Sequence, residues 1–152
     1  MNRPPVVIDA SVAIKLVVIE QSTNNARALV DDCIRDGRGM FAPPHMRGEA
    51  ANGIYQRLRT ADQAKRLDRV GVDNALSQLL RYPIETLDPP ALYERALDFA
   101  ALHHLGAIYD ALYVVLAQLF GAELWTADKR LLTALGGRAP WVRDISSYPL
   151  TP

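Results

Sequence analysis

The sequence predicts an α/β domain with a mainly parallel sheet, and three observations support this fold class. The chain has 152 residues, 49% hydrophobic and 22% charged, which is the size and composition of one ordinary globular domain. No repeat, linker or low-complexity stretch divides it, so one domain over residues 1–152 is expected. Short apolar runs alternate with segments in which apolar residues have helical spacing, and this alternation is typical of strands connected through helices.

In the first half of the chain we expect two strands and four helices. Residues 6–8 (VVI) are a short apolar run rich in β-branched residues, and residues 40–42 (MFA) form a second run before a proline pair. Apolar residues at helical spacing predict a helix over 22–36, which Gly37 closes. Further helices are expected at 11–18, 45–59 and 62–81, the last of them ending before Tyr82–Pro83.

In the second half, strands are expected at 84–87, 123–126 and, at a sheet edge, 141–143. Helices are expected at 91–103, 109–120 and from Asp128 over KRLLTALG. The segment 109–120 is apolar almost all round, which is typical of a helix buried at the centre of a fold. Two consecutive helices separate strands at 45–81 and again at 91–120, so the winding is not one helix per strand.

Two acidic residues directly follow predicted strands. Asp9 comes after strand 6–8, and Asp128 follows strand 123–126. In parallel sheets, sites form at the carboxyl ends of the strands, so both carboxylates are expected at one edge.

Two more acids are expected at the same edge. The helix 109–120 enters strand 123–126 through a two-residue turn, so it must end at the opposite edge and begin, with Asp110, at this one. Glu49 lies early in the helix that follows strand 40–42, again on the carboxyl side. The sequence does not show how the short loop after helix 91–103 reaches Asp110.

This set of oxygen ligands suits a hard divalent cation, Mg²⁺ or Mn²⁺. Such a cation activates water for attack on a phosphodiester and neutralises charge on the phosphate. Thr126, beside Asp128, would either bond a catalytic water or cap the following helix. No glycine-rich phosphate loop, Cys/His zinc pattern or nucleophile-elbow motif competes with this interpretation.

Each acid also has a purely structural interpretation. Asp9 and Asp128 stand before helices, where aspartate is a favoured N-cap. Asp110, in a first helical turn, would complement the helix dipole, and Glu49 would be a solvated helix residue. The convergence of all four, rather than any one of them, favours an active site.

Composition and charge exclude several other classes. Lys plus Arg equals Asp plus Glu at 17 each, so a basic surface must be local, and the single cysteine, Cys33, allows no internal disulfide or Cys-rich zinc site. No apolar run is long enough for a signal peptide or a membrane span, and a cytoplasmic protein is expected.

His45, His103 and His104 are interpreted as surface or core residues. A mild basic excess between residues 57 and 81 would either contact a phosphate backbone or form a solvated face: Arg57, Arg59, Lys65, Arg66, Arg69 and Arg81.

At these residues the sequence resembles the PIN-domain nucleases and, among them, the VapC-type toxins of prokaryotic toxin–antitoxin pairs. VVIDASVAIKL resembles the first motif with Asp9, and APPHMRGEAANGIYQ the second with Glu49. YDALYVVLAQLFGAELWTADKRLL is the most similar and carries Asp110, Thr126 and Asp128. The resemblance implies a three-layer α/β/α domain, Mg²⁺ or Mn²⁺ dependence, cleavage of single-stranded RNA, a homodimer, and inhibition by a cognate VapB-like antitoxin.

Three functions compete at this stage. The first is a ribonuclease toxin held inactive by its antitoxin, and the second is a stand-alone PIN nuclease that processes RNA. The third is a catalytically silent binding module, whose acids would be caps and surface charges. The complete set of four acids argues against the third function, and the compactness of the chain favours the first over the second.

Overall fold

A five-stranded, all-parallel sheet forms the centre of the computed structural model, which describes residues 3–150. Its strand order is β3-β2-β1-β4-β5. The strands are β1 (Val6–Ile8), β2 (Met40–Ala42), β3 (Glu85–Thr86), β4 (Glu123–Thr126) and β5 (Val142–Asp144). In the register, Val7 lies opposite Phe41 of β2 on one side and Leu124 of β4 on the other. The predicted parallel sheet is therefore confirmed, and every pairing in it is parallel.

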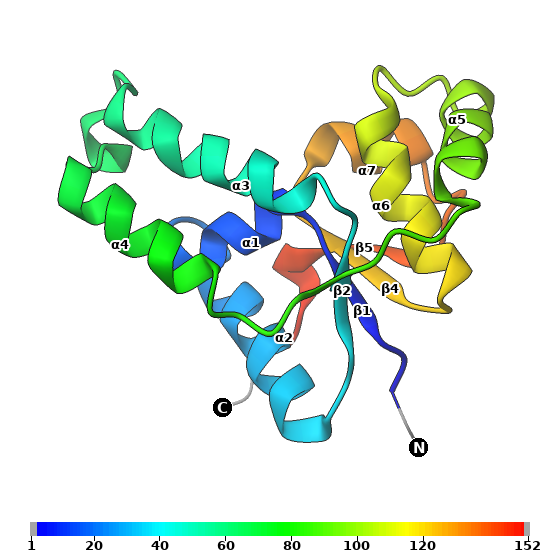
Figure 1. Ribbon diagram of the computed structural model, residues 1–152, viewed down its shortest axis with the longest axis horizontal. Coiled ribbons are helices and arrows are strands. Elements are labelled where there is room, and N and C mark those ends of the chain that lie inside the picture. Colours follow the sequence, from blue (N-terminus) through cyan, green and yellow to red (C-terminus); the bar gives the residue numbers. More distant parts are fainter. Residues whose placement is uncertain (1–2, 151–152) are drawn as a thin grey trace.

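Helices cover both faces of the sheet, which gives the three-layer α/β/α arrangement (Figure 1). Within residues 3–150 the helices are α1 (Ala10–Val17), α2 (Thr23–Asp36), α3 (Met46–Tyr55), α4 (Arg69–Leu79), α5 (Leu92–Leu102), α6 (Ile108–Leu119) and α7 (Lys129–Leu135). On one face α6 packs against β1 and β4, with α5 beside it. On the other face α1 packs against α2, and α3 and α4 are stacked on α1. No helix of the described residues is long and apolar enough to cross a membrane.

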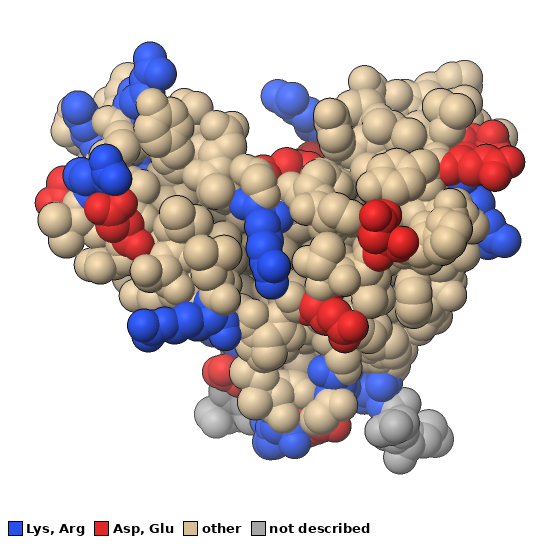
Figure 2. Space-filling view, in the orientation of Figure 1, with Lys and Arg blue, Asp and Glu red and all other residues tan. Residues whose placement is uncertain are grey.

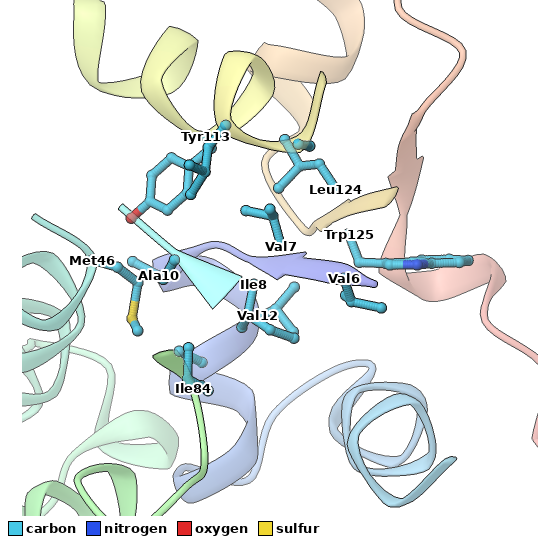
Figure 3. Packing of buried hydrophobic residues seen from close by; sticks show 14 of the residues in the cluster. Val6, Val7, Ile8, Ala10, Val12, Met46, Ile84, Tyr113, Leu124 and Trp125 are labelled. Carbon is cyan, nitrogen blue, oxygen red and sulfur yellow. The ribbon is translucent and has the colours of Figure 1, made fainter. Parts of the chain in front are cut away.

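The core lies on both sides of β1, all three residues of which are completely buried. Successive side chains of a strand point to opposite faces. Figure 3 accordingly shows Val7 and Leu124 directed toward α6, and Val6 and Ile8 directed toward α1 and α2. Burial on both faces explains why β1 is a continuous apolar run in the sequence.

Helix α6 connects the core to the carboxyl edge of the sheet. Its residues from Ala111 to Ala117 are all buried, as the apolar segment predicted. A tight turn joins it to β4, in which Gly121 has a φ of 58° that glycine adopts at little cost. Because this turn lies at the amino edge, α6 runs antiparallel to β4 and its first turn lies at the carboxyl edge.

The path from β3 to α6 supplies the connection that the sequence left open. Figure 1 shows the chain crossing from β3 to the far end of α5, which then runs up toward the carboxyl edge. Residues 103–107 join the end of α5 to the start of α6 at that edge, and the two helices pack against each other. Asp110 is thereby placed at the carboxyl edge.

The continuous helix predicted over 62–81 is wrong. A 3-10 turn at Gln63–Lys65 comes first, and α4 begins only at Arg69. The Asp62 carboxylate accepts the Ala64 N–H at 3.0 Å, and the Asp68 carboxylate accepts the Gly71 N–H at 2.8 Å. These caps satisfy backbone donors locally and so replace helical hydrogen bonds.

Candidate active site

Asp9 is the most deeply buried acid at the carboxyl edge of the sheet. It follows β1 directly, caps the N-terminus of α1, and is 5% exposed. One carboxylate oxygen, Oδ1, accepts the Val12 N–H at 3.0 Å and the Ser11 hydroxyl at 2.6 Å. Burial raises the pKa of Asp9 to about 6, although hydrogen bonds from Ser11 and Thr126 oppose the shift. The charged form is therefore unfavourable here without a compensating cation.

Two hydroxyl groups connect the end of β1 to the end of β4. Ser11 donates to Asp9 and accepts the Ala127 N–H at 2.9 Å. Thr126 is completely buried, and its hydroxyl accepts the Asp128 N–H at 3.0 Å. Thr126 thus lies where the sequence predicted it. The contact of Ser11 with Ala127 depends on the pairing of strands that are far apart in the chain.

Asp128 is an N-cap as well as a member of the acidic edge. Its Oδ1 accepts the backbone N–H groups of Arg130 at 2.9 Å and Leu131 at 3.2 Å. None of the described residues donates a hydrogen bond to Oδ2. Capping therefore occupies one carboxylate oxygen, and the structural and catalytic interpretations of this residue are compatible.

Asp110 lies in the first turn of α6 and Glu49 in the first turn of α3. Burial raises the pKa of Asp110, and the charges of Asp128 and Glu49 raise it further. Asp128 also contributes to the raised pKa of Asp9. These mutual effects show that all four predicted acids share one electrostatic environment. Glu49 is the most peripheral, with 42% of its side chain exposed.

His45 contributes to this edge in a way that the sequence interpretation missed. Its Nε2 lies 2.8 Å from Oε1 of Glu49, four residues later on the same helical face. Its ring packs on Tyr113 with 4.7 Å between centroids. The sequence interpretation of His45 as a surface or core residue did not include this contact with Glu49. His103, in contrast, stacks on Phe99 at 4.2 Å, away from the acids.

The acids are neighbours but do not form a closed metal cage. Within residues 3–150, no three His, Cys, Asp or Glu side chains lie close enough together to make a ready-made metal site. Magnesium commonly binds proteins through only one or two carboxylates and keeps several of its waters. The donors present, all carboxylate oxygens, therefore fit a partly hydrated Mg²⁺ or Mn²⁺ ion.

A buried hydroxyl group provides independent support for a polar ligand at this edge. Tyr113 is 3% exposed, and its hydroxyl oxygen lies near the Ala10 N–H, but its own proton has no acceptor among the described residues. Figure 3 shows its oxygen pointing toward Ala10, the residue that follows Asp9. Burial, together with the charges of Glu49 and Asp9, raises the pKa of Tyr113, so its hydroxyl stays protonated. Because an unsatisfied buried hydroxyl costs about 1–3 kcal/mol, this position is suited to a hydrated ion or a substrate oxygen.

Few positively charged side chains contact the four acids. No Lys or Arg within residues 3–150 forms an ion pair with any of the four acids. Figure 2 shows acidic atoms at the floor of a notch between two arms of the molecule. Of the basic residues between 57 and 81, for which phosphate contact and a solvated face were both left open, Arg57 pairs with Glu20, Lys65 with Asp62 and Arg69 with Asp73. The positive charges of these three side chains are thus partly neutralised by their acidic partners.

Comparison with known proteins relates this geometry to a family. A search of curated proteins finds no significant match. Among solved structures, the crystal structure of PAE2754 from Pyrobaculum aerophilum superimposes with a TM-score of 0.68 and 21% identity, covering 95% of this chain and 92% of that one. This similarity shows a shared fold. The PIN-domain family profile matches residues 6–135, which include all four acids. The chain therefore belongs to the PIN-domain family, whose members are generally nucleases that use divalent metal ions.

Proposed function

We propose that this PIN-domain protein is a metal-dependent endoribonuclease. The observation that carries the proposal is the convergence of four carboxylates, from four separate elements, without a Lys or Arg partner in the described chain. Carboxylates brought together in this way repel one another, and an uncompensated cluster is stabilised when it binds a divalent cation. Asp9, Asp110 and Asp128 would hold the ion, with Glu49 contributing from the rim.

Hydrogen bonds within the protein orient the carboxylates of this site without a bound ion. Ser11 and the Val12 N–H fix the orientation of Asp9, while the α7 backbone fixes that of Asp128. Tyr113 keeps its proton and can donate it in a hydrogen bond to a water or phosphate oxygen. A bound divalent cation would supply an activated water and would neutralise charge that develops on the phosphate. Thr126 holds the backbone of Asp128 in place.

Cleavage of a structured RNA pool tests this proposal directly. The wild type should cleave RNA with Mg²⁺ or Mn²⁺, and EDTA should abolish the activity. Asp9→Asn and Asp110→Asn should each reduce the rate by at least about 100-fold, because even outer partners of a metal site contribute about 10- to 100-fold. Asp98→Asn, on the exposed surface of α5, is the matched control and should retain full activity.

The controls also show which outcome contradicts the proposal. Circular dichroism should show native helix content in all three variants, since each keeps the size of the side chain. Full activity in EDTA would rule out a metal-dependent nuclease. Full activity of both Asp9→Asn and Asp110→Asn would show that the acidic edge is not the active site.

We further propose that the nuclease is the toxin of a toxin–antitoxin pair and acts as a homodimer. The resemblance of its three motifs to VapC-type toxins supports this assignment. Two large apolar side chains of α5, Leu97 and Leu102, are 61% and 71% exposed, which fits a surface that a protein partner covers. An antitoxin arginine would be a natural inhibitor, because a guanidinium binds carboxylate oxygens in pairs.

Expression in a bacterial host tests the toxin assignment. The wild type alone should arrest growth, whereas Asp9→Asn at equal protein level should not. Coexpression with a short adjacent reading frame should restore growth. If an active, folded wild type is harmless at high level, the alternative of a stand-alone RNA-processing nuclease is favoured.

A further inference from the structure

An exposed aromatic ring lies beside the acidic edge and has no role in the mechanism above. Tyr109 immediately precedes Asp110 in the first turn of α6, and it is 57% exposed. Its ring contacts the ring of His45, with 5.4 Å between centroids and 44° between planes. Because more than half of the residue remains accessible, the ring still offers surface to a flat ligand.

This ring is held in place rather than free on the surface. His45 packs on the buried Tyr113 from α6 and also contacts Glu49 through Nε2. The stack Tyr109–His45–Tyr113 thus joins the start of α3 to the start of α6, the two helices that supply Glu49 and Asp110. An aromatic side chain fixed in this way loses little conformational entropy when a ligand stacks on it.

We propose that Tyr109 stacks on a nucleobase of single-stranded RNA and so positions the adjoining phosphate at the carboxylates. This inference rests on the proposed nuclease function and extends it to the mode of substrate binding. The four acids have no Lys or Arg ion-pair partners in residues 3–150, so affinity for RNA beyond that of a bound cation has to come from contacts beside them. An aromatic ring supplies such affinity with any base, because every base has a π-face.

The geometry favours an unpaired strand over a duplex. Inside a duplex both faces of each base are covered by neighbouring bases, so a base must leave the stack before it can contact Tyr109. A single strand has no such cost at that position. Tyr109 is therefore a positioning residue that selects flexible RNA, and it touches no reacting atom.

Binding of a fluorescein-labelled RNA hexamer tests the inference. All measurements are made by anisotropy with Mg²⁺ on an Asp9→Asn background, which prevents cleavage during the titration. Tyr109→Leu should raise Kd by about 5- to 140-fold, equivalent to the roughly 1–3 kcal/mol of one base stack at 1.4 kcal/mol per tenfold change. Tyr109→Phe keeps the ring and should bind within about twofold of the parent, since stacking does not need the hydroxyl.

Tyr93 provides the matched control. It is 48% exposed and lies near the start of α5, the end remote from the carboxyl edge (Figure 1). Tyr93→Leu removes a similar exposed ring and should leave Kd unchanged. Melting curves of all variants establish that Tyr109→Leu is folded.

A series of hexamers, each lacking one base, separates stacking from indirect effects. For the parent protein, loss of the stacked base should weaken binding as much as Tyr109→Leu does. For Tyr109→Leu the same loss should cost nothing further, because the partner of that base is already absent. Equal additional losses in both proteins would overturn the inference.

The outcomes distinguish this inference from the proposed function. If the wild type cleaves RNA but Tyr109→Leu matches it in affinity and in kcat/KM, the stacking inference fails and the nuclease assignment stands. If the wild type neither binds nor cleaves RNA, both fail. If Tyr109→Leu instead loses only binding of a protein partner, the ring belongs to a protein interface and the inference is overturned.

Discussion

Acidic residues at the two edges of the sheet differ in whether they have Lys or Arg ion-pair partners. At the amino edge, Glu123 contacts Arg38 at 3.5 Å and Arg143 at 3.1 Å, and it accepts the Trp125 indole N–H at 3.2 Å. At the carboxyl edge, Asp9 and Asp110 have no Lys or Arg ion-pair partner in residues 3–150. At the carboxyl edge Asp144 of β5 pairs with Lys129, so the contrast is between Glu123, which fixed cations stabilise, and Asp9 and Asp110, which have no such cation.

This contrast shows that burial of an acid does not by itself identify an active site. Asp32 on α2 is also largely buried, but the Tyr148 hydroxyl and Arg35 hold its pKa below the ordinary value. For Asp9, burial outweighs the hydrogen bonds and the pKa rises. An acid whose charged form lacks compensation indicates that something else, here a divalent cation, completes the site.

The largest expected effect distinguishes the edges by metal binding. A ligand present at 100 times its Kd, if it binds only the folded state, adds about 3 kcal/mol to the free energy of unfolding. Mn²⁺ should therefore raise the melting temperature of the wild type by roughly 5–10 °C, and EDTA should reverse the shift.

Substitutions at N-caps provide the comparison for this measurement. Asp9→Ala and Asp110→Ala should lose most of the Mn²⁺ shift. Asp128→Ala should lose both a cap, worth about 0.5–2 kcal/mol, and part of the shift. Asp68→Ala, a cap of α4 away from the acids, should melt lower yet keep the whole shift. If no variant differs from the wild type in its metal response, the four acids are caps and surface charges.

A second test compares the pH dependence of the two edges in the metal-free protein. The pKa of Asp9 is about 6 in the folded state against an ordinary value of 3.8. Between these values the folded state binds more protons, so the free energy of unfolding should fall by about 3 kcal/mol as pH rises through this window. For Asp32, whose pKa is lowered, the contribution is present above its ordinary pKa and is lost as pH falls.

Urea unfolding in EDTA between pH 4 and pH 7 measures this difference. Asp9→Asn should remove most of the decline in stability between pH 4 and 6. Asp32→Asn should retain that decline, because the contribution of Asp32 changes with pH only below its ordinary pKa of 3.8. An unchanged slope in Asp9→Asn would mean that another group is responsible.

The smallest expected effect comes from removing one charge at each edge. Glu123→Gln leaves the guanidinium of Arg38, with a side chain 3% exposed, without its carboxylate, and should cost about 1–3 kcal/mol. Asp110→Asn relieves repulsion from Asp128 and Glu49, so the metal-free variant should be as stable as the wild type or more stable. Urea unfolding at pH 7 in EDTA compares the two. A loss of similar size in both variants would erase the distinction between the edges.

Much of the fold and of the acidic edge was predictable because both depend on local patterns. The apolar strand before Asp9 and the buried pattern of α6 are visible in the sequence, and parallel topology then places the acids together. The late start of α4 at Arg69 was missed, because Asp62 caps a 3-10 turn and Asp68 caps α4, and apolar spacing does not reveal such caps.

The contributions that were missed at the site depend on contacts across the chain. Ser11 accepts the Ala127 N–H, and this contact joins residues 116 positions apart. His45 and Glu49 have visible i, i+4 spacing, yet the packing of His45 against Tyr113 exists only after α3 and α6 have docked. Tyr113 resembled a core residue in the sequence, because apolar spacing does not show that its hydroxyl would be buried without an acceptor beside Ala10.

Because a tight turn joins α6 to β4, the length of α6 determines where Asp110 lies. One end of α6 is fixed at the amino edge by Gly121, and the other end carries Asp110. Each added residue turns a helix by about 100° and lengthens it by about 1.5 Å, so a single insertion within α6 would swing Asp110 away from Asp128 and would also rotate the buried residues of α6 out of register with the core. Residues 59–68, between α3 and α4, lie in exposed turns and can absorb length changes without moving an acid. Natural variation in chain length is therefore expected in residues 59–68. The length of α6, in contrast, sets the distance of Asp110 from Asp128.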